Sequence, residues 1–263
     1  AIESRLYAED PYRNFLPSIG RLTRYRPPEE VVEDDRAVRN DTGVYEGGEI
    51  SMYYDPMIAK LCTWAPTRPA AIAEMTRALD RFEVEGIGHN LPFLSAVMAH
   101  PRFQSGQITT AFIAEEYPDG FHGVTPDDDT LRRVAGASAA MFRLDEIRRA
   151  RISGRMDNHE RLVGRDWVVA LAGQQHAVTI EADRSGATVH FAEGGAMRVE
   201  SDWTPGRALA ELSIDGAPMA LKVGRTSTGF RIRTGGADLT VRVWTPRQAE
   251  LAAVMPGKAP PDT

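Results

Sequence analysis

The chain has 263 residues, of which 42% are hydrophobic and 26% charged, and its formal net charge at pH 7 is −6. This length and composition are typical of a folded protein with two domains of ordinary size. The negative charge argues against general nucleic-acid binding, and no apolar run approaches the roughly 20 residues that cross a bilayer.

Residues 1–60 predict short strands separated by turns. The opening AIESRLYAEDP lacks the features of a signal peptide and resembles the middle of a strand, so we expect the amino-terminal part of a larger protein to precede it. Residues 38–50, VRNDTGVYEGGEI, favour a hairpin or tight loop. Residues 51–64, SMYYDPMIAKLCTW, predict a buried strand interrupted by Pro56, in which the single cysteine, Cys62, is an inert buried thiol.

Three helices are predicted over residues 67–117. Thr67 is a good N-cap for the first, whose apolar face has the 3–4 spacing of Ile72, Met75, Leu79 and Phe82. A second helix is expected over 91–100, and a short third one near 109–116.

A long helix is predicted from about 127 to 151. Three aspartates at 127–129 suit its positive end, and a cation site is the alternative interpretation of these carboxylates. The run AGASAA at 135–140 is small enough for other backbones to approach closely, so we expect this helix to be surrounded rather than laid on a surface.

From Asp166 onward the pattern is all-β. Eight short alternating segments are separated by turn signals, which favours an antiparallel barrel or a strongly curved sheet. The segments are WVVALAG, HAVTIEAD, ATVHFAE, AMRVESDW, ALAELSID, PMALKVGR, GFRIRTG and LTVRVWTP. The sequence therefore predicts an α+β chain in which the long helix packs inside an eight-stranded antiparallel β-barrel-like domain.

Common catalytic and metal-binding motifs are absent from the sequence. The six histidines form no HExxH or zinc spacing, and there is no GxSxG elbow, Walker lysine loop or GxGxxG after a strand. Residue patterns alone therefore predict a two-domain protein without an assigned activity.

Two adjoining segments carry a resemblance to a known family. Residues 3–25, ESRLYAEDPYRNFLPSIGRLTRY, match a Glu-x-Arg-x-x-Ala-Glu-Asp-Pro stretch followed by Phe-Leu-Pro-Ser-x-Gly. Residues 53–61, YYDPMIAKL, match Tyr-Tyr-Asp-x-Met-Ile-x-Lys-Leu, and EGIGHN at 85–90 is similar to a glycine turn that ends in Asn. Over about residues 1–117 the chain thus resembles the carboxyl-terminal lobe of ATP-grasp biotin carboxylases, although 27–52 is loosely matched.

A third segment narrows the resemblance. FIAEEYPDGFHG, at 112–123, looks like the exit from the biotin carboxylase domain in the propionyl-CoA carboxylase α-subunit family. The following helix and eight strands are similar to that family's BT-type domain, which docks on a carboxyltransferase β subunit. The implied domains are a carboxylase lobe at 1–117, a docking domain at 118–250 and, at 251–263, a linker toward an absent biotin carrier domain. Lys258 does not match the carrier's Met-Lys-Met acceptor, so no biotin attachment residue is expected in this chain.

This resemblance implies a ligase subunit that carboxylates biotin for transfer to propionyl-CoA, giving methylmalonyl-CoA. The implied cofactors and substrates are biotin carried on another domain, ATP with Mg²⁺ or Mn²⁺, and bicarbonate. In the family the ATP-binding residues precede this segment, so we expect the chain to be inactive alone. The implied partners are the carboxyltransferase β subunit through 118–250, the biotin carrier domain and other α subunits, with no nucleic acid and no membrane. The implied location is the bacterial cytoplasm, or the mitochondrial matrix in a eukaryote.

The resemblance also assigns site residues. Arg5 matches the arginine that stabilises negative charge on the biotin ureido oxygen; a surface salt bridge is the alternative. Tyr54 and Asp55 match positions that line the biotin site, with a structural role as the alternative for Asp55. Arg39 falls at a contact between two biotin carboxylase domains, and Lys60 is expected to be structural. No metal-ligating residue is predicted.

Two other functions remain open at this point. One is the α subunit of a methylcrotonyl-CoA or acetyl-CoA carboxylase, because acyl choice is made largely on the β subunit. The other is a non-catalytic subunit-interaction module, in which the barrel only docks partners.

Overall fold

The computed structural model describes residues 1–151, 161–183 and 185–255, which form two compact units. The first unit comprises Ala1–Pro126 with two short segments, Ala220–Lys222 and Arg233–Asp238, and the second comprises the remainder. Most of the predicted linker, residues 256–263 with Lys258, lies outside the described residues. No helix in the described ranges has the length and apolar character needed to span a membrane.

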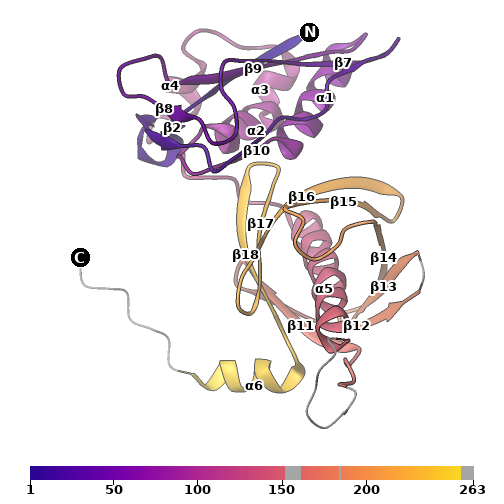
Figure 1. Cartoon of the computed structure of the whole chain (residues 1–263). Helices are drawn as coiled ribbons and strands as arrows, with labels where there is room; N and C mark the ends of the chain where they lie inside the picture. The colour runs from indigo at the N-terminus through magenta and orange to yellow at the C-terminus, as the bar shows by residue number, and fades with distance from the viewer. Residues whose placement is uncertain (152–160, 184, 256–263) are drawn as a thin grey trace. The chain divides into compact units, whose positions relative to one another are not determined.

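A four-stranded antiparallel sheet organises the first unit (Figure 1). Its strands, in spatial order, are β1 (Ile2–Tyr7), β9 (Met57–Trp64), β7 (Ala37–Thr42) and β6 (Val31–Val32). One face buries Leu6, Ile58 and Leu61 in a core shared with Met75 and Leu79 of helix α1 (Arg68–Arg81). The opposite face of β1 therefore carries the residues that alternate with the buried ones.

Strand β7 differs from the hairpin or tight loop predicted over 38–50. It pairs with β9 on one side and β6 on the other, and only Val38 of its six side chains is fully buried. Backbone pairing to a strand that comes later in the chain holds β7 in place, and side-chain patterning cannot reveal such pairing. Strand β9 begins directly after Pro56, at the interruption that the sequence predicts.

Three two-stranded ribbons complete the strands of the first unit. They pair β2 (Glu9–Asp10) with β3 (Leu16–Pro17), β4 (Gly20–Arg21) with β8 (Glu49–Ile50), and β5 (Arg24–Arg26) with β10 (Glu83–Glu85). A 3₁₀ turn, η1 (Pro11–Arg13), joins β2 to β3.

The helices of the first unit follow the predicted pattern with one addition. The Thr67 hydroxyl accepts a hydrogen bond from the Ala70 N–H at 3.3 Å, which confirms it as the N-cap of α1. Helices α2 (Leu91–Ala99) and α4 (Phe112–Glu116) correspond to the other two predicted helices. A further turn, α3 (Pro101–Ser105), begins at the proline taken as a helix end, because proline suits a first helical turn.

The second unit is built around helix α5 (Asp128–Ala150), which lies among the strands of a closed barrel (Figure 1). Buried residues occur all round α5, from Leu131 to Ala150, so the prediction of a surrounded helix is confirmed. The barrel strands are β11 (Asp166–Leu171), β12 (Gln174–Ala182), β13 (Gly186–Phe191), β14 (Ala196–Ser201), β15 (Leu209–Ile214), β16 (Ala217–Arg225), β17 (Gly229–Thr234) and β18 (Ala237–Trp244).

Helix α5 is capped at its amino-terminal end and closely packed at its middle. The Asp127 carboxylate accepts a hydrogen bond from the Thr130 N–H at 2.8 Å and caps the helix, as the helix-start interpretation of the three aspartates requires. Midway along α5, a Cβ added at Gly136 would lie 2.6 Å from the Met197 sulfur. The small residues of 135–140 therefore permit the close approach of strand β14.

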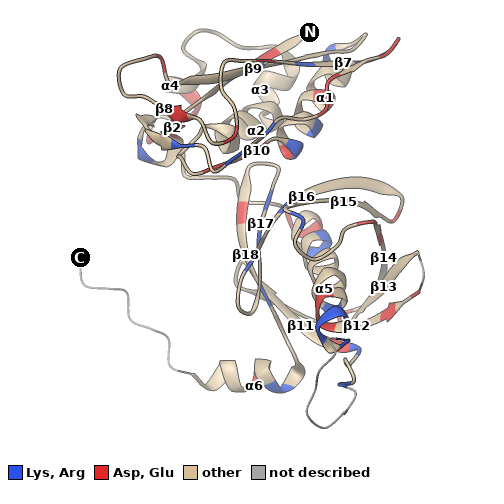
Figure 2. Ribbon diagram, in the orientation of Figure 1, with Lys and Arg blue, Asp and Glu red and all other residues tan. Residues whose placement is uncertain are grey.

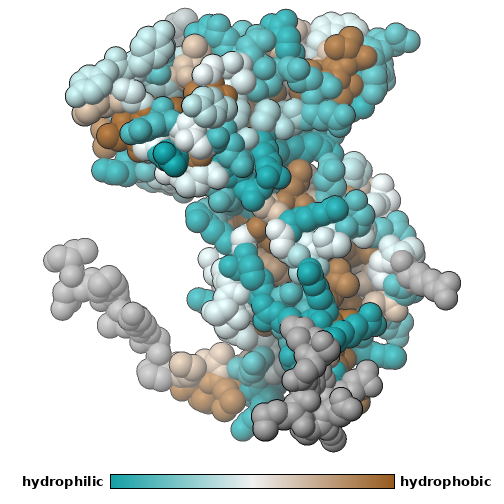
Figure 3. Space-filling view, viewed as in Figure 1, coloured by the Kyte–Doolittle hydropathy of each residue, from teal (hydrophilic) through white to brown (hydrophobic). Residues whose placement is uncertain are grey.

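Helix α6 (Pro246–Val254) ends the described chain. Thr245 and Gln248 form a reciprocal capping box at its start. The first four residues of the predicted linker, 251–254, are thus helical. Leu251 and Val254 of α6 expose apolar side chains. Figure 3 shows hydrophobic residues gathered on the surface at the end of the described chain. Charged residues of both signs are interspersed in each unit (Figure 2).

Candidate functional site

Three of the predicted site residues, Arg5, Lys60 and Arg39, lie on the outward face of β1, β9 and β7. Glu3, Arg5 and Tyr7 alternate with buried residues along β1, so their side chains project from this face. Strand pairing sets Lys60 of β9 opposite Arg5, and Asp41 of β7 opposite Lys60. The face therefore presents fixed charges of both signs in a short cross-strand row.

The side chain of Arg5 is 56% exposed and is held by its own strand. Its Nε–H donates to Glu3 Oε1 at 2.9 Å. The hydrogen bond to Glu3, with a smaller one to Tyr7, raises the pKa of the Arg5 guanidinium above its usual value. Arg5 is thus a permanent cation, open to solvent and fixed through its Nε.

The backbone around Arg5 is fixed by a residue 85 positions away in the sequence. Asn90 is the last residue of the EGIGHN turn and is 5% exposed. Its Nδ2 donates to the Arg5 carbonyl at 3.1 Å, and its Oδ1 accepts from the Tyr7 N–H at 2.9 Å. The Asn90 N–H donates to the Tyr7 carbonyl at 3.2 Å. A single buried amide residue therefore binds the β1 backbone at both Arg5 and Tyr7.

Tyr54 and Asp55 lie in the loop that precedes β9. The Tyr54 side chain is 84% exposed. The Asp55 carboxylate accepts from the Met57 N–H at 2.9 Å, and the Ala8 N–H donates to the Pro56 carbonyl at 2.8 Å, which ties this loop to the chain just after β1. Burial raises the pKa of the Glu9 carboxyl, and the negative charge of Asp55 adds to that effect.

These placements bring Asp55 close to a second carboxylate. In the described parts of the chain, Arg5 forms no hydrogen bond with Tyr54 or Asp55. A role for these two residues toward biotin therefore stays a prediction, as does the structural role of Lys60.

Arg39 occupies a neighbouring position on the same face. It lies on β7 with its side chain 68% exposed, and its Nη2 donates to Asp41 Oδ2 at 3.1 Å. This hydrogen bond to Asp41 is the main cause of the raised pKa of Arg39. Cys62 pairs with both Arg39 and Glu3 across the strands and is half-buried, not fully buried as predicted, because its position in the β9 alternation puts it on the outward face.

The described ranges contain no ready-made metal site. No group of three or more His, Cys, Asp or Glu side chains there is arranged to hold a metal ion. His100, His176 and His190 each pair with a glutamate, Glu116, Glu193 and Glu181 respectively. These histidines thus make polar contacts with side chains of their own units.

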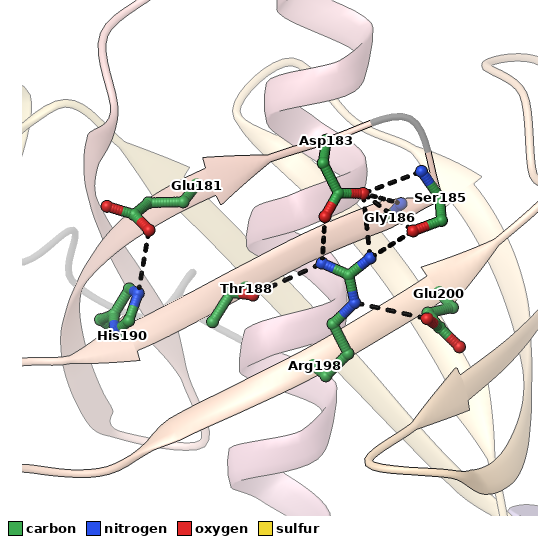
Figure 4. Close-up of polar contacts among 8 residues, drawn as sticks. All are labelled: Glu181, Asp183, Ser185, Gly186, Thr188, His190, Arg198 and Glu200. Atoms are coloured by element: carbon green, nitrogen blue, oxygen red, sulfur yellow. Dashed lines mark hydrogen bonds and ion pairs between the residues drawn. The ribbon is translucent and has the colours of Figure 1, made fainter.

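A second polar cluster lies on the outer face of the barrel strands β12 to β14 (Figure 4). The Asp183 carboxylate accepts from the backbone N–H groups of Ser185 and Gly186 at 2.8 and 3.0 Å. Arg198 of β14 donates to both Asp183 oxygens, at 2.8 and 2.9 Å, and contacts Glu200 at 3.4 Å. These bonds hold the pKa of the Asp183 carboxyl well below its usual range. The cluster ties the turn between β12 and β13 to β14.

The residues that hold Arg5 were not identified as such from the sequence. Glu3 belongs to the matched motif, but its ion pair with Arg5 depends on two side chains of one strand facing the same way. Asn90 closes the matched turn at 85–90, yet nothing local indicates that its amide reaches β1. The only sequence feature that could have drawn attention to Asn90 was its place at the end of this glycine turn.

Two protein-family models match this chain. The model of the biotin carboxylase C-terminal domain matches residues 3–115, and that of the propionyl-coenzyme A carboxylase BT domain matches residues 134–258. In a solved structure, the biotin carboxylase subunit of a pyruvate carboxylase is 37% identical, with 44% of this chain and 25% of that chain covered and a TM-score of 0.40.

Curated relatives align along the whole chain. The propionyl-CoA carboxylase alpha chain of Ruegeria pomeroyi is 69% identical over 278 residues, which covers 100% of this chain and 41% of that relative. The mitochondrial alpha chain of Mus musculus is 35% identical, covering 100% of this chain and 36% of the relative. The mouse mitochondrial methylcrotonoyl-CoA carboxylase subunit alpha is 36% identical over 54% of this chain and 18% of its own length. The chain thus spans less than half the length of these relatives.

Proposed function

We propose that this chain, which belongs to the propionyl-CoA carboxylase alpha-chain family, is part of a biotin-dependent acyl-CoA carboxylase. It contributes the biotin-facing lobe and the subunit-docking domain of that enzyme. The domains we assign are 1–117 for the lobe, 118–250 for the docking domain and 251–263 for a linker toward a biotin carrier domain. The observation that carries the proposal is the exposed Arg5 guanidinium, fixed through its Nε and through its backbone.

Carboxylation of biotin calls for a fixed positive charge near the ureido oxygen. Biotin supplies the ureido nitrogen that is carboxylated, with ATP, Mg²⁺ or Mn²⁺ and bicarbonate as the other components. As that nitrogen loses its proton, negative charge develops on the ureido oxygen. A guanidinium already held in position stabilises this charge more in the transition state than in the ground state. Arg5 fits this role because its planar donors stay charged throughout the physiological pH range.

Neighbouring residues complete the proposed site. Glu3 orients the Arg5 side chain, and Tyr54 and Asp55 line the approach from the loop before β9. Arg39, on the same sheet, is assigned to a contact between two biotin carboxylase domains. These assignments rest on motif matches, with the exposure of Tyr54 and Arg39 in support.

The test of Arg5 needs a complete enzyme. We would exchange the corresponding region of the Ruegeria pomeroyi alpha chain for this chain and measure ADP formation that depends on free biotin. Arg5→Ala is expected to lower kcat about 100- to 1,000-fold, the usual cost of removing one donor to a developing anion. Arg36→Ala is the matched control, since Arg36 also pairs with a neighbouring glutamate, Glu33. Full activity in the Arg5→Ala enzyme would contradict the proposed function.

The docking role of 118–250 has its own test. We propose that this domain binds a carboxyltransferase β subunit, in keeping with the family model that matches 134–258. The chimeric α chain should co-purify with that β subunit and carboxylate propionyl-CoA faster than acetyl- or methylcrotonyl-CoA. A preference for another acyl-CoA would favour the corresponding carboxylase. Docking without any biotin carboxylation would favour a non-catalytic interaction module. We place the assembly in the bacterial cytoplasm, or in the mitochondrial matrix if the source is eukaryotic.

A further inference from the structure

We propose that Asn90 is a positioning residue for Arg5, one that sets the direction of its guanidinium by clamping the backbone of strand β1. The inference rests on the proposed function of Arg5 and adds a residue that acts through it. Asn90 does not touch the reacting atoms in this proposal.

The hydrogen bonds from Asn90 to β1, here called the clamp, take the place of a neighbouring strand. Among the described residues, β1 is the edge strand of the order β1-β9-β7-β6, so one of its sides has no strand partner there. Backbone N–H and C=O groups need hydrogen-bond partners when they are withdrawn from water. Asn90 supplies them on this side, donating to the Arg5 carbonyl at 3.1 Å and accepting from the Tyr7 N–H at 2.9 Å. Its own N–H donates to the Tyr7 carbonyl at 3.2 Å.

The Asn90 bonds also lie beside an irregularity in the pairing of β1 with β9. The register shifts between Leu6 and Tyr7, one residue beyond Arg5, where the extra residue is Ile58 of β9. Such a bulge locally redirects side chains and leaves the ladder weaker at that point. The Asn90 bonds reach Arg5 on one side of the shift and Tyr7 on the other. They therefore hold the β1 backbone in one geometry opposite the bulge, and with it the direction in which Arg5 leaves the sheet.

Asn90 makes these bonds in place of a more common one. It occupies the N-cap position of α2, where asparagine is among the favoured residues because its side chain caps the helix. Here the Asn90 side chain makes no capping bond to α2. Its amide is turned to β1, and the residue is 5% exposed. The need for an amide at position 90 thus comes from the Arg5 segment and not from the helix that it begins.

The geometry demands a carboxamide. One group must donate to the Arg5 carbonyl while another accepts from the Tyr7 N–H, and near neutral pH asparagine does both through two separate atoms of its amide. An ionised aspartate keeps the acceptor and loses the donor. A protonated aspartic acid regains a donor through its O–H. Alanine loses both bonds.

The experiment uses the chimeric full-length alpha chain described above, with free biotin. Asn90→Ala and Asn90→Asp are expected to lower kcat for biotin-dependent ADP formation about 10- to 100-fold, the range that a small misplacement of a catalytic group produces. ATP cleavage that depends on bicarbonate but not on biotin should change less than twofold. Thr63→Val is the matched control, because it removes a buried hydrogen bond in the same sheet, from Thr63 Oγ1 to the Ala71 carbonyl at 3.0 Å.

A double mutant separates positioning from general support. If Asn90 acts through Arg5, then Asn90→Ala causes no further loss of kcat once Arg5→Ala is present. A further tenfold loss in that background would overturn the proposal, as would an Asn90→Ala enzyme that keeps wild-type kcat. Unchanged activity in Arg5→Ala alone would instead count against the proposed function, so the two failures can be told apart.

A pH profile distinguishes the loss of the Asn90 hydrogen bonds from poor folding of the variant. The Asn90→Asp enzyme should recover activity, relative to wild type, as the pH is lowered and the introduced carboxyl gains its O–H donor. Loss of stability alone would give no such recovery. A constant ratio of the two activities across pH would contradict the clamp even if Asn90→Ala could not be purified.

Discussion

Asp183 shows how one surface carboxylate becomes tied to the fold. The hydrogen bond from Arg198, together with bonds from Ser185 and Gly186, keeps its pKa well below the usual range (Figure 4). A carboxyl whose pKa is lowered by folding stabilises the native state above its unfolded pKa of about 4. That contribution is lost as the pH falls toward the lower pKa of the folded state.

The Asp183→Asn variant should therefore be less stable than wild type near neutral pH. The difference should shrink below about pH 4, because Asp183 then takes up a proton in the unfolded chain while it stays ionised in the folded protein. Urea unfolding at both pH values measures this. Asp202→Asn is the control, since Asp202 is 86% exposed and its ion pair with Arg207 is 3.7 Å long. An equal loss of stability at the two pH values would count against this account of Asp183.

Helix α5 depends on the absence of a side chain at Gly136. Glycine ordinarily weakens a helix interior, so a larger residue would be expected to help the helix alone. Here an added Cβ would meet the Met197 sulfur at 2.6 Å and the Phe191 ring at 3.4 Å. Met197 and Phe191 are both buried, so they have little room to move.

Gly136→Val should thus lower the free energy of unfolding by about 1–3 kcal/mol, the usual cost of an overpacked core. Thermal unfolding followed by near-UV circular dichroism measures the change. Adding Met197→Ala should restore part of the loss, because it removes the atom in the way. A Gly136→Val protein as stable as wild type would show that the barrel around α5 is not close-packed at this layer.

The sequence predicts the elements that are stabilised by interactions between residues close together in the chain. The barrel strands alternate clearly between buried and exposed residues, and Thr67 and Asp127 cap helices by local hydrogen bonds, so the predicted fold class is confirmed. Strand β7 was not predicted because it is stabilised by pairing with β9, which comes later in the chain. The same limit applies to the site: Arg5 stands in a recognisable motif, whereas Asn90 reaches it only in the folded lobe.

At the scale of the whole molecule, the family resemblance drawn from residues 3–25, 53–61 and 112–123 is confirmed by two family models and by a relative 69% identical along the chain. The chain spans 41% of that relative. Activity should therefore be judged in the full-length context.

We expect the isolated chain to show no ATP hydrolysis that depends on bicarbonate and biotin. The reason is that, in the family, the residues that hold ATP precede this segment. A coupled ADP-release assay measures the rate, with the chimeric alpha chain as the positive control. Turnover by the isolated chain above the rate without biotin would contradict the expectation.

The closure of the barrel has a consequence for synthesis on the ribosome. Strand β11 pairs with β12 and with β18, so that Val168 faces both Ala177 and Trp244. The hairpin partner emerges at once, while the second partner emerges only near the end of the described chain. Until then β11 has an unpaired edge, of the kind that invites pairing with other nascent chains. Translation speed through β16 to β18 would then govern how long each new chain remains exposed to aggregation.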